Sequence, residues 1–139
     1  MDASVTWKGK MSFVGTANSG FVLPLDTKVE QGGDGSGFSP MELVLMGLAG
    51  CTGMDVLEIL RKKRQDVTGF DVRVHGDRAE THPKVYTHIL VEYFVTGRSL
   101  DPAAVDRAVE LSFTKYCPVQ AMLALSAQVE HKITILEVA

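Results

Sequence analysis

Cysteine, basic charge and any sign of export are scarce in this sequence, and each scarcity excludes a class of protein. The formal net charge of -3 argues against nucleic acid or an anionic membrane as the main partner. Residues 1–8 contain no apolar stretch behind a basic start, so no export signal is predicted. Two cysteines in such a chain indicate a reducing compartment, where a disulfide is transient rather than structural. We therefore expect a cytoplasmic protein.

Membrane, phosphate and metal motifs are also missing. The most apolar segment, Leu43–Leu60, carries Asp55 and Glu58 and is not expected to span a membrane. The glycine-rich segment Gly32–Gly37 lacks the Gly-Lys-Ser/Thr ending of a phosphate loop. No cysteine or histidine stands in a Cys-x-x-Cys or His-x-x-x-His spacing, so neither a metal site nor a cofactor is predicted. The histidines concerned are His75, His82, His88 and His131.

The length of 139 residues and the hydrophobic content of 45% predict one globular domain over residues 1–139. Three extended segments open the chain, and Gln31–Gly37, with four glycines, is interpreted as a mobile linker. A long helix follows, and then strand, strand, helix, helix and strand. Because strands and helices do not alternate regularly, the pattern predicts an α+β fold rather than a doubly wound one.

The long helix has the clearest start signal. Ser39, Pro40 and Glu42 form a capping box with proline at the first helical position, and the helix is expected to run to about Arg64. Its first half, residues 43–51, has no polar side chain except the thiol of Cys51. A helix that is apolar on all sides is buried on all sides. One short chain supplies little surface for this, so the pattern favours a dimer.

Each cysteine has a plain interpretation and a functional one. Cys51 lies among three glycines within the helix, which indicates either tight packing around an inert core cysteine or close approach of a backbone or substrate. Cys117 precedes Pro118 at the start of a later helix, where the positive helix end lowers a thiol pKa. On electrostatics alone Cys117 is the better nucleophile, although it could simply replace serine as a cap.

Two motifs resemble those of a known family. The run SPMELVLMGLAGC, from Ser39 to Cys51, is followed by a basic helix end and much later by the sequence YCPV, residues 116–119. These motifs resemble the OsmC/Ohr family of thiol peroxidases, and the longer run to Val67 resembles its YhfA-like branch. The resemblance implies an OsmC-like fold, in which a long central helix packs on antiparallel sheets in an intertwined homodimer.

The resemblance also implies a chemistry. By position, Cys51 matches the family's peroxidatic cysteine and Cys117 its resolving cysteine, so both are candidate catalytic residues. Cys51 would be oxidised by an organic hydroperoxide to sulfenic acid, Cys117 would close a disulfide, and a dithiol reductant, often a lipoyl group in this family, would restore both thiols. The implied activity is a hydroperoxide reductase, an oxidoreductase of oxidative stress defence.

The chain departs from the family pattern at two supporting positions. Family members hold an arginine of the N-terminal hairpin with a glutamate directly after the helix proline, but residues 1–38 contain no arginine and Met41 follows the proline. Glu42, Lys8 and Lys10 are the candidate supporting residues instead. These departures favour an alternative, a non-catalytic protein that binds an apolar small molecule at the dimer interface. A redox sensor is a third hypothesis.

Overall fold

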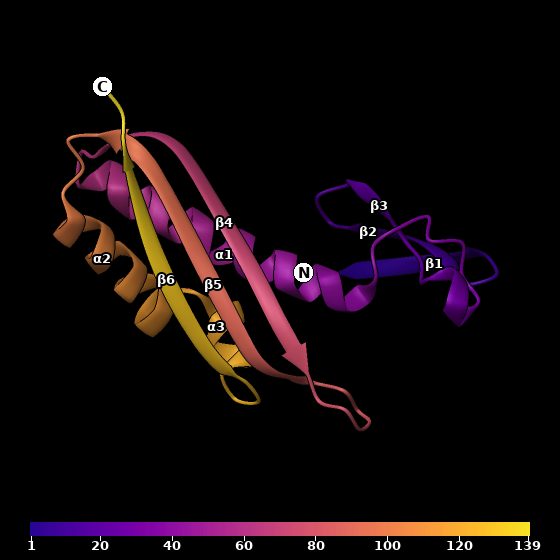
Figure 1. The fold of residues 1–139 in the computed structure, drawn as a ribbon. Helices are drawn as coiled ribbons and strands as arrows, with labels where there is room; N and C mark the ends of the chain where they lie inside the picture. Colours follow the sequence, from indigo (N-terminus) through magenta and orange to yellow (C-terminus); the bar gives the residue numbers. More distant parts are fainter. The chain divides into compact units, whose positions relative to one another are not determined.

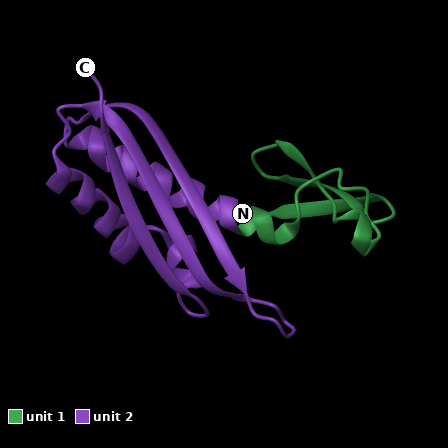
Figure 2. Ribbon diagram, viewed as in Figure 1, with its two compact units in different colours: residues 1–44 green, residues 45–139 purple.

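The structure is a computed structural model that describes all 139 residues. The chain forms two compact units, residues 1–44 and residues 45–139 (Figure 2). The single domain over residues 1–139 stays a prediction.

The first unit contains a three-stranded antiparallel sheet. Strands β1 (Ala3–Gly9), β2 (Ser12–Ala17) and β3 (Val22–Leu25) lie in the order β1-β2-β3 (Figure 1). The β1–β2 turn passes through Gly9, with φ of 121°, a conformation that glycine adopts without steric cost. The three extended segments that the sequence predicts at the start of the chain are therefore confirmed.

The glycine-rich segment is a structured loop, so its interpretation as a linker is wrong. A short 3₁₀ helix, η1 (Val29–Gln31), begins it, and the buried carboxylate of Asp26 organises the rest. This carboxylate accepts hydrogen bonds from the Asp34 N–H at 3.2 Å, the Ser36 N–H at 3.1 Å and the Ser36 hydroxyl at 2.6 Å. A Cβ on Gly33 would lie 2.2 Å from a backbone oxygen. Glycine is therefore needed here for close packing rather than for mobility.

Asp26 should make the stability of the protein depend on acid pH. Its hydrogen bonds, chiefly that from the Ser36 hydroxyl, lower the pKa of Asp26 to about 2. Because this lies below the pKa of ~3.9 in an unfolded chain, the stabilisation is present above about pH 4 and is lost as pH falls from about 4 to 2. We expect Asp26→Asn to lower the urea midpoint at pH 7 and to flatten its decline in acid. Asp106→Asn, at an exposed position, should change neither, and equal midpoints for wild type and Asp26→Asn would contradict the expectation.

Helix α1 (Pro40–Lys62) begins with the predicted capping box. The Ser39 N–H donates to the Glu42 carboxylate at 3.1 Å, and the Glu42 N–H donates to the Ser39 hydroxyl at 3.3 Å. Within the single chain only one stripe of α1 is buried, so burial on all sides, which the sequence analysis expects of a dimer, stays a prediction. That stripe repeats every fourth residue: Leu48, Thr52, Val56 and Leu60.

The length and composition of α1 would suit a membrane-crossing helix, a test that the core helix of a soluble protein also passes. Met54 on this helix is 75% exposed. The helix therefore has apolar surface that its own chain leaves uncovered.

The second unit is built on a mixed sheet. Strands β4 (Asp66–Arg78) and β5 (Tyr86–Arg98) are antiparallel, and β6 (Gln128–Glu137) runs parallel to β5. Between β5 and β6 come α2 (Pro102–Leu111), the π-helical turn η2 (Ser112–Tyr116) and α3 (Pro118–Leu123). Such a helical crossover brings the chain back in the same direction. The predicted α+β class and element order are confirmed, while the parallel β6 pairing refines the expected antiparallel sheets.

The core of the second unit lies between this sheet and its helices. Helices α1 and α2 lie on one face of the sheet (Figure 1). The inward side chains of β5 are fully buried, as are those on one face of α2. They are Ile89, Val91, Tyr93 and Val95 of β5, and Val105, Ala108 and Val109 of α2.

Candidate active site

The two cysteines lie close together in the second unit. The sulfurs of Cys51 and Cys117 and a carboxylate oxygen of Asp55 all lie within 4.8 Å of one another. Both thiols are free; Cys51 is partly buried and Cys117 is 3% exposed. A disulfide requires a sulfur–sulfur distance of ~2.05 Å, so the two side chains would have to move closer together to form one.

Helix α1 provides two of the three groups. Cys51 and Asp55 are one turn apart and therefore project from the same face. The neighbouring stripe, with Leu48, Thr52 and Val56, is buried and fixes the rotation of the helix. The site therefore follows from how α1 packs in its own unit.

The π-helical turn η2 positions the third group. The Cys117 N–H donates to the Ser112 carbonyl, five residues back, at 2.9 Å. Cys117 is then the N-cap of α3, and its sulfur accepts a hydrogen bond from the Gln120 N–H at 3.4 Å. Single π-helical turns occur frequently at functional sites. The sequence predicts two helices here, and the π-helical turn that joins them was not foreseen.

A chain of buried hydroxyls ends at Asp55. The Thr52 hydroxyl forms hydrogen bonds with the Tyr93 hydroxyl at 2.5 Å and with the Ser112 hydroxyl at 2.7 Å. The Ser112 hydroxyl in turn donates to the Asp55 carboxylate at 3.0 Å. Each hydroxyl has one proton. Because the Ser112 hydroxyl uses its proton in the hydrogen bond to Asp55, the Thr52 hydroxyl must donate its hydrogen bond to Ser112. The Tyr93 hydroxyl must then donate to Thr52. Burial raises the pKa of Tyr93, which keeps it a donor, so the chain orients Asp55 toward the thiols.

Burial keeps Cys117 protonated. It raises the pKa of the Cys117 thiol to about 11; the Gln120 N–H opposes this, and the neighbouring Cys51 adds to it. Burial therefore acts against the lowering of the Cys117 pKa that its place at a helix start predicts. Helix α3 has six residues, and the positive end of so short a helix does not outweigh the removal of the sulfur from water.

The sequence analysis did not assign Thr52, Ser112 and Tyr93 to this site. Asp55 stands one turn beyond Cys51, so its place near that thiol follows from the sequence. Thr52 is a small polar residue on the buried stripe of α1, and Ser112 is a buried polar residue at the start of η2. Their pairing crosses elements far apart in the sequence and had no local signal.

Comparison with known proteins now identifies the family. Residues 33–132 match the model of the family described as OsmC-like protein. The chain belongs to the OsmC-like protein family. The matched region includes both cysteines and Asp55.

Relatives of this OsmC-like chain cover almost its whole length. It is 42% identical over 135 residues to protein YhfA of Escherichia coli K12, covering 97% of this chain and 98% of YhfA. A hypothetical protein of Aquifex aeolicus is 30% identical, with a TM-score of 0.81 and 96% of both chains covered. The organic hydroperoxide resistance protein OhrB of Bacillus subtilis has a TM-score of 0.63 at 18% identity, covering 96% of this chain and 98% of OhrB, and shares the fold.

The predicted supporting residues of this OsmC-like protein lie in the first unit. Glu42 is engaged in the helix cap, and Lys10 forms an ion pair with Asp34 at 3.0 Å. Lys8 lies in β1. Their role toward the thiols stays a prediction.

A cavity of about 360 Å³ is bounded in part by Asp55 of the site. Its walls combine apolar side chains with both signs of charge. The lining residues are Asp55, Glu58, Ile59, Lys62, Lys63, Leu111 and Tyr116. Solvent and small molecules can therefore reach the carboxylate from this side.

Proposed function

We propose that this OsmC-like protein is a two-cysteine reductase of organic hydroperoxides that acts in oxidative stress defence. The observation that carries the proposal is the approach of the Cys51 and Cys117 sulfurs to within 4.8 Å. Membership of the OsmC-like family and the shared fold with OhrB, a hydroperoxide resistance protein by name, support it.

In the first step, Cys51 is the nucleophile. It is the more exposed of the two thiols, and burial holds Cys117 protonated. The Cys51 thiolate attacks the terminal oxygen of ROOH and the O–O bond breaks. The leaving alkoxide takes a proton to become ROH, and Cys51 becomes sulfenic acid.

In the second step, Cys117 loses its proton and attacks the Cys51 sulfur. Water leaves and a disulfide forms. The carboxylate of Asp55, within 4.8 Å of both sulfurs, is placed to accept the Cys117 proton. An external dithiol, such as a lipoyl group, then reduces the disulfide and is itself oxidised to its cyclic disulfide. The sum is ROOH plus dithiol giving ROH, water and the oxidised dithiol.

We further propose that the protein acts as a cytoplasmic homodimer. Helix α1 leaves apolar side chains such as Met54 exposed in the single chain. A Cβ built on Gly47 or Gly50 meets no atom within 4 Å, so this surface has room for close approach of another backbone. Both observations support a second copy of the chain as the element that covers α1.

Intact mass and free-thiol counts after one equivalent of cumene hydroperoxide test the reductase proposal. We expect the reduced protein to lose about two mass units and both thiols, because closing one disulfide removes two hydrogens. In Cys117→Ser, dimedone should trap sulfenic acid on Cys51. Cys51→Ser should leave its remaining thiol intact over the same time.

The outcomes separate this proposal from its alternatives. Survival of both thiols for hours would contradict the reductase and favour a binding protein for an apolar small molecule. A disulfide that forms fast but is not turned over by any dithiol would favour a redox sensor. Sulfenic acid trapped on Cys117 instead would reverse the roles of the two cysteines.

A further inference from the structure

Two thiols and a carboxylate within ligand distance of one another form a metal-binding set. We propose that Cys51, Asp55 and Cys117 bind a zinc ion. In this chain they are the one set of three metal-ligating side chains whose donor atoms all lie within 4.8 Å. The sequence did not predict the site because its ligands come from α1 and from the start of α3, with no short spacing between the cysteines.

The geometry fits zinc closely. Tetrahedral zinc with Zn–S bonds of ~2.3 Å and Zn–O bonds of ~2.0 Å places its ligand atoms roughly 3.5–3.8 Å apart. From separations of up to 4.8 Å, the three donor atoms need to close by about 1.3 Å at most to reach this arrangement. A water molecule can complete the tetrahedron, and the cavity bordered by Asp55 gives solvent access to that ligand.

Hydrogen bonds favour the ionised forms of two of the ligands, and zinc must itself displace the proton that burial keeps on the Cys117 thiol. The Ser112 hydroxyl donates to one oxygen of Asp55, which orients the carboxylate and leaves its other oxygen for the metal. The Gln120 N–H donates to the Cys117 sulfur and would stabilise its thiolate. Such outer contacts typically set the orientation and affinity of metal ligands. Binding releases one proton from each thiol, so the zinc ion, two thiolates and one carboxylate together carry a charge of -1. Lys63 lines the same cavity as Asp55 and carries the opposite charge.

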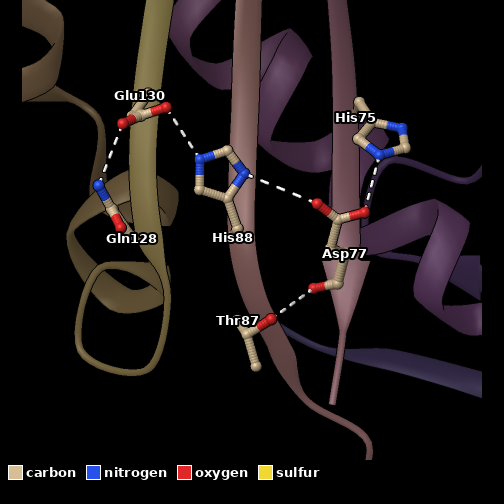
Figure 3. A network of polar contacts seen from close by, with 6 residues as sticks. All are labelled: His75, Asp77, Thr87, His88, Gln128 and Glu130. Atoms are coloured by element: carbon tan, nitrogen blue, oxygen red, sulfur yellow. Dashed lines mark hydrogen bonds and ion pairs between the residues drawn. The ribbon is translucent and has the colours of Figure 1, made fainter. Parts of the chain in front are cut away.

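The other candidate metal site is a surface cluster on the outer face of the second sheet, made by His75, Asp77, His88 and Glu130 (Figure 3). His88 lies between two carboxylates, with Nδ1 at 3.8 Å from Asp77 and Nε2 at 2.9 Å from Glu130. The two ring nitrogens point in opposite directions, so one ion cannot use both. His75 contacts Asp77 at 2.9 Å. The exposed ion pairs account for why these side chains lie together without a metal. A substitution in this cluster is therefore a matched control for the zinc measurement.

Zinc would act on the dithiol as a reversible protecting group. Each thiolate shares one electron pair with the metal, which makes it a weaker nucleophile toward peroxide while zinc is bound. Binding itself requires no peroxidase activity, and it can be measured in the absence of peroxide. The zinc proposal can therefore fail or succeed independently of the reductase proposal.

Competition with a chromogenic zinc chelator tests the site on the fully reduced full-length protein. We expect one Zn²⁺ per chain, and release of protons on binding. Cys51→Ser, Cys117→Ser and Asp55→Asn should each weaken binding by at least the roughly 10–100-fold that loss of an outer-shell partner costs. His88→Ala should bind as wild type does. Thermal unfolding of each variant shows that it is folded.

Cobalt gives a second readout that does not depend on the variants. Co²⁺ in the wild-type site should show the strong near-ultraviolet absorption of thiolate-to-metal charge transfer, and Zn²⁺ should abolish it. Weak binding that the double variant Cys51→Ser/Cys117→Ser retains in full would overturn the proposal. So would loss of binding in His88→Ala alone, which would place the ion at the surface cluster.

Discussion

In Cys51→Ser protein, Cys117 should react with iodoacetamide slowly at pH 8 and about tenfold faster for each unit of pH up to at least pH 10. The thiolate is the reacting form, and the pKa of Cys117 is raised to about 11. About one thiol in a thousand is then ionised at pH 8, and the reaction follows that fraction. Intact mass against time at each pH gives the rate.

The expected profile separates two opposing effects on Cys117. Burial removes the sulfur from water and disfavours the thiolate, whereas the start of α3 and the Gln120 N–H favour it. Burial is the larger cause and remains when serine replaces Cys51. A rate that levels off near pH 7–8 would show that the helix start prevails after all.

Cys117→Ser protein is the matched control for that measurement. It leaves Cys51, whose sulfur is the more exposed of the two, and we expect faster alkylation at pH 8. The order of the two rates bears directly on the reductase proposal, since the faster thiol is the better candidate for the first attack on peroxide. Circular dichroism at pH 10 would confirm that both proteins are folded.

Thr52→Val should destabilise the protein by about 1–3 kcal/mol, although it changes the volume of the side chain very little. The Thr52 hydroxyl joins those of Tyr93 and Ser112, and all three residues are buried. Valine removes the hydrogen bond to the Tyr93 hydroxyl, and an unsatisfied buried polar group costs about 1–3 kcal/mol, whereas Ser112 keeps its hydrogen bond to Asp55. In a chain of this size the melting temperature should fall by roughly 5–15 °C.

Urea unfolding of wild type, Thr52→Val and Thr134→Val measures this effect. Thr134 is an exposed residue of β6, and the same substitution there should change the free energy of unfolding by less than about 0.5 kcal/mol. A loss below about 1 kcal/mol in Thr52→Val would mean that Tyr93 and Ser112 find other partners. The chain of hydroxyls would then not be what orients Asp55.

Local sequence signals determined much of the fold. The capping box at Ser39 and Glu42 forms as predicted, and so do the element order and the α+β class. These features depend on residues a few positions apart, whose propensities and hydrogen bonds act within one turn or one strand. The family resemblance likewise rested on two short motifs, and the comparisons with known proteins confirmed it.

Where short-range rules failed, the reason was a contact that the local pattern does not contain. The glycines of residues 32–37 indicated mobility, but Asp26 binds the backbone of that loop. The apolar pattern of α1 does not tell which of its sides the chain's own core covers, and the structure shows a single stripe. In both cases the decisive partner lies outside the segment.

The sequence by itself determined which residues could carry chemistry, and only the tertiary structure decided how they combine. Cys51 and Cys117 could be singled out from their motifs, but their approach to within 4.8 Å, with Asp55 beside them, depends on how α1 and the π-helical turn pack. Burial likewise raises the pKa of Cys117, against the direction predicted from its helix start. Distance and desolvation are properties of the packed chain, because they depend on neighbours that are remote in sequence.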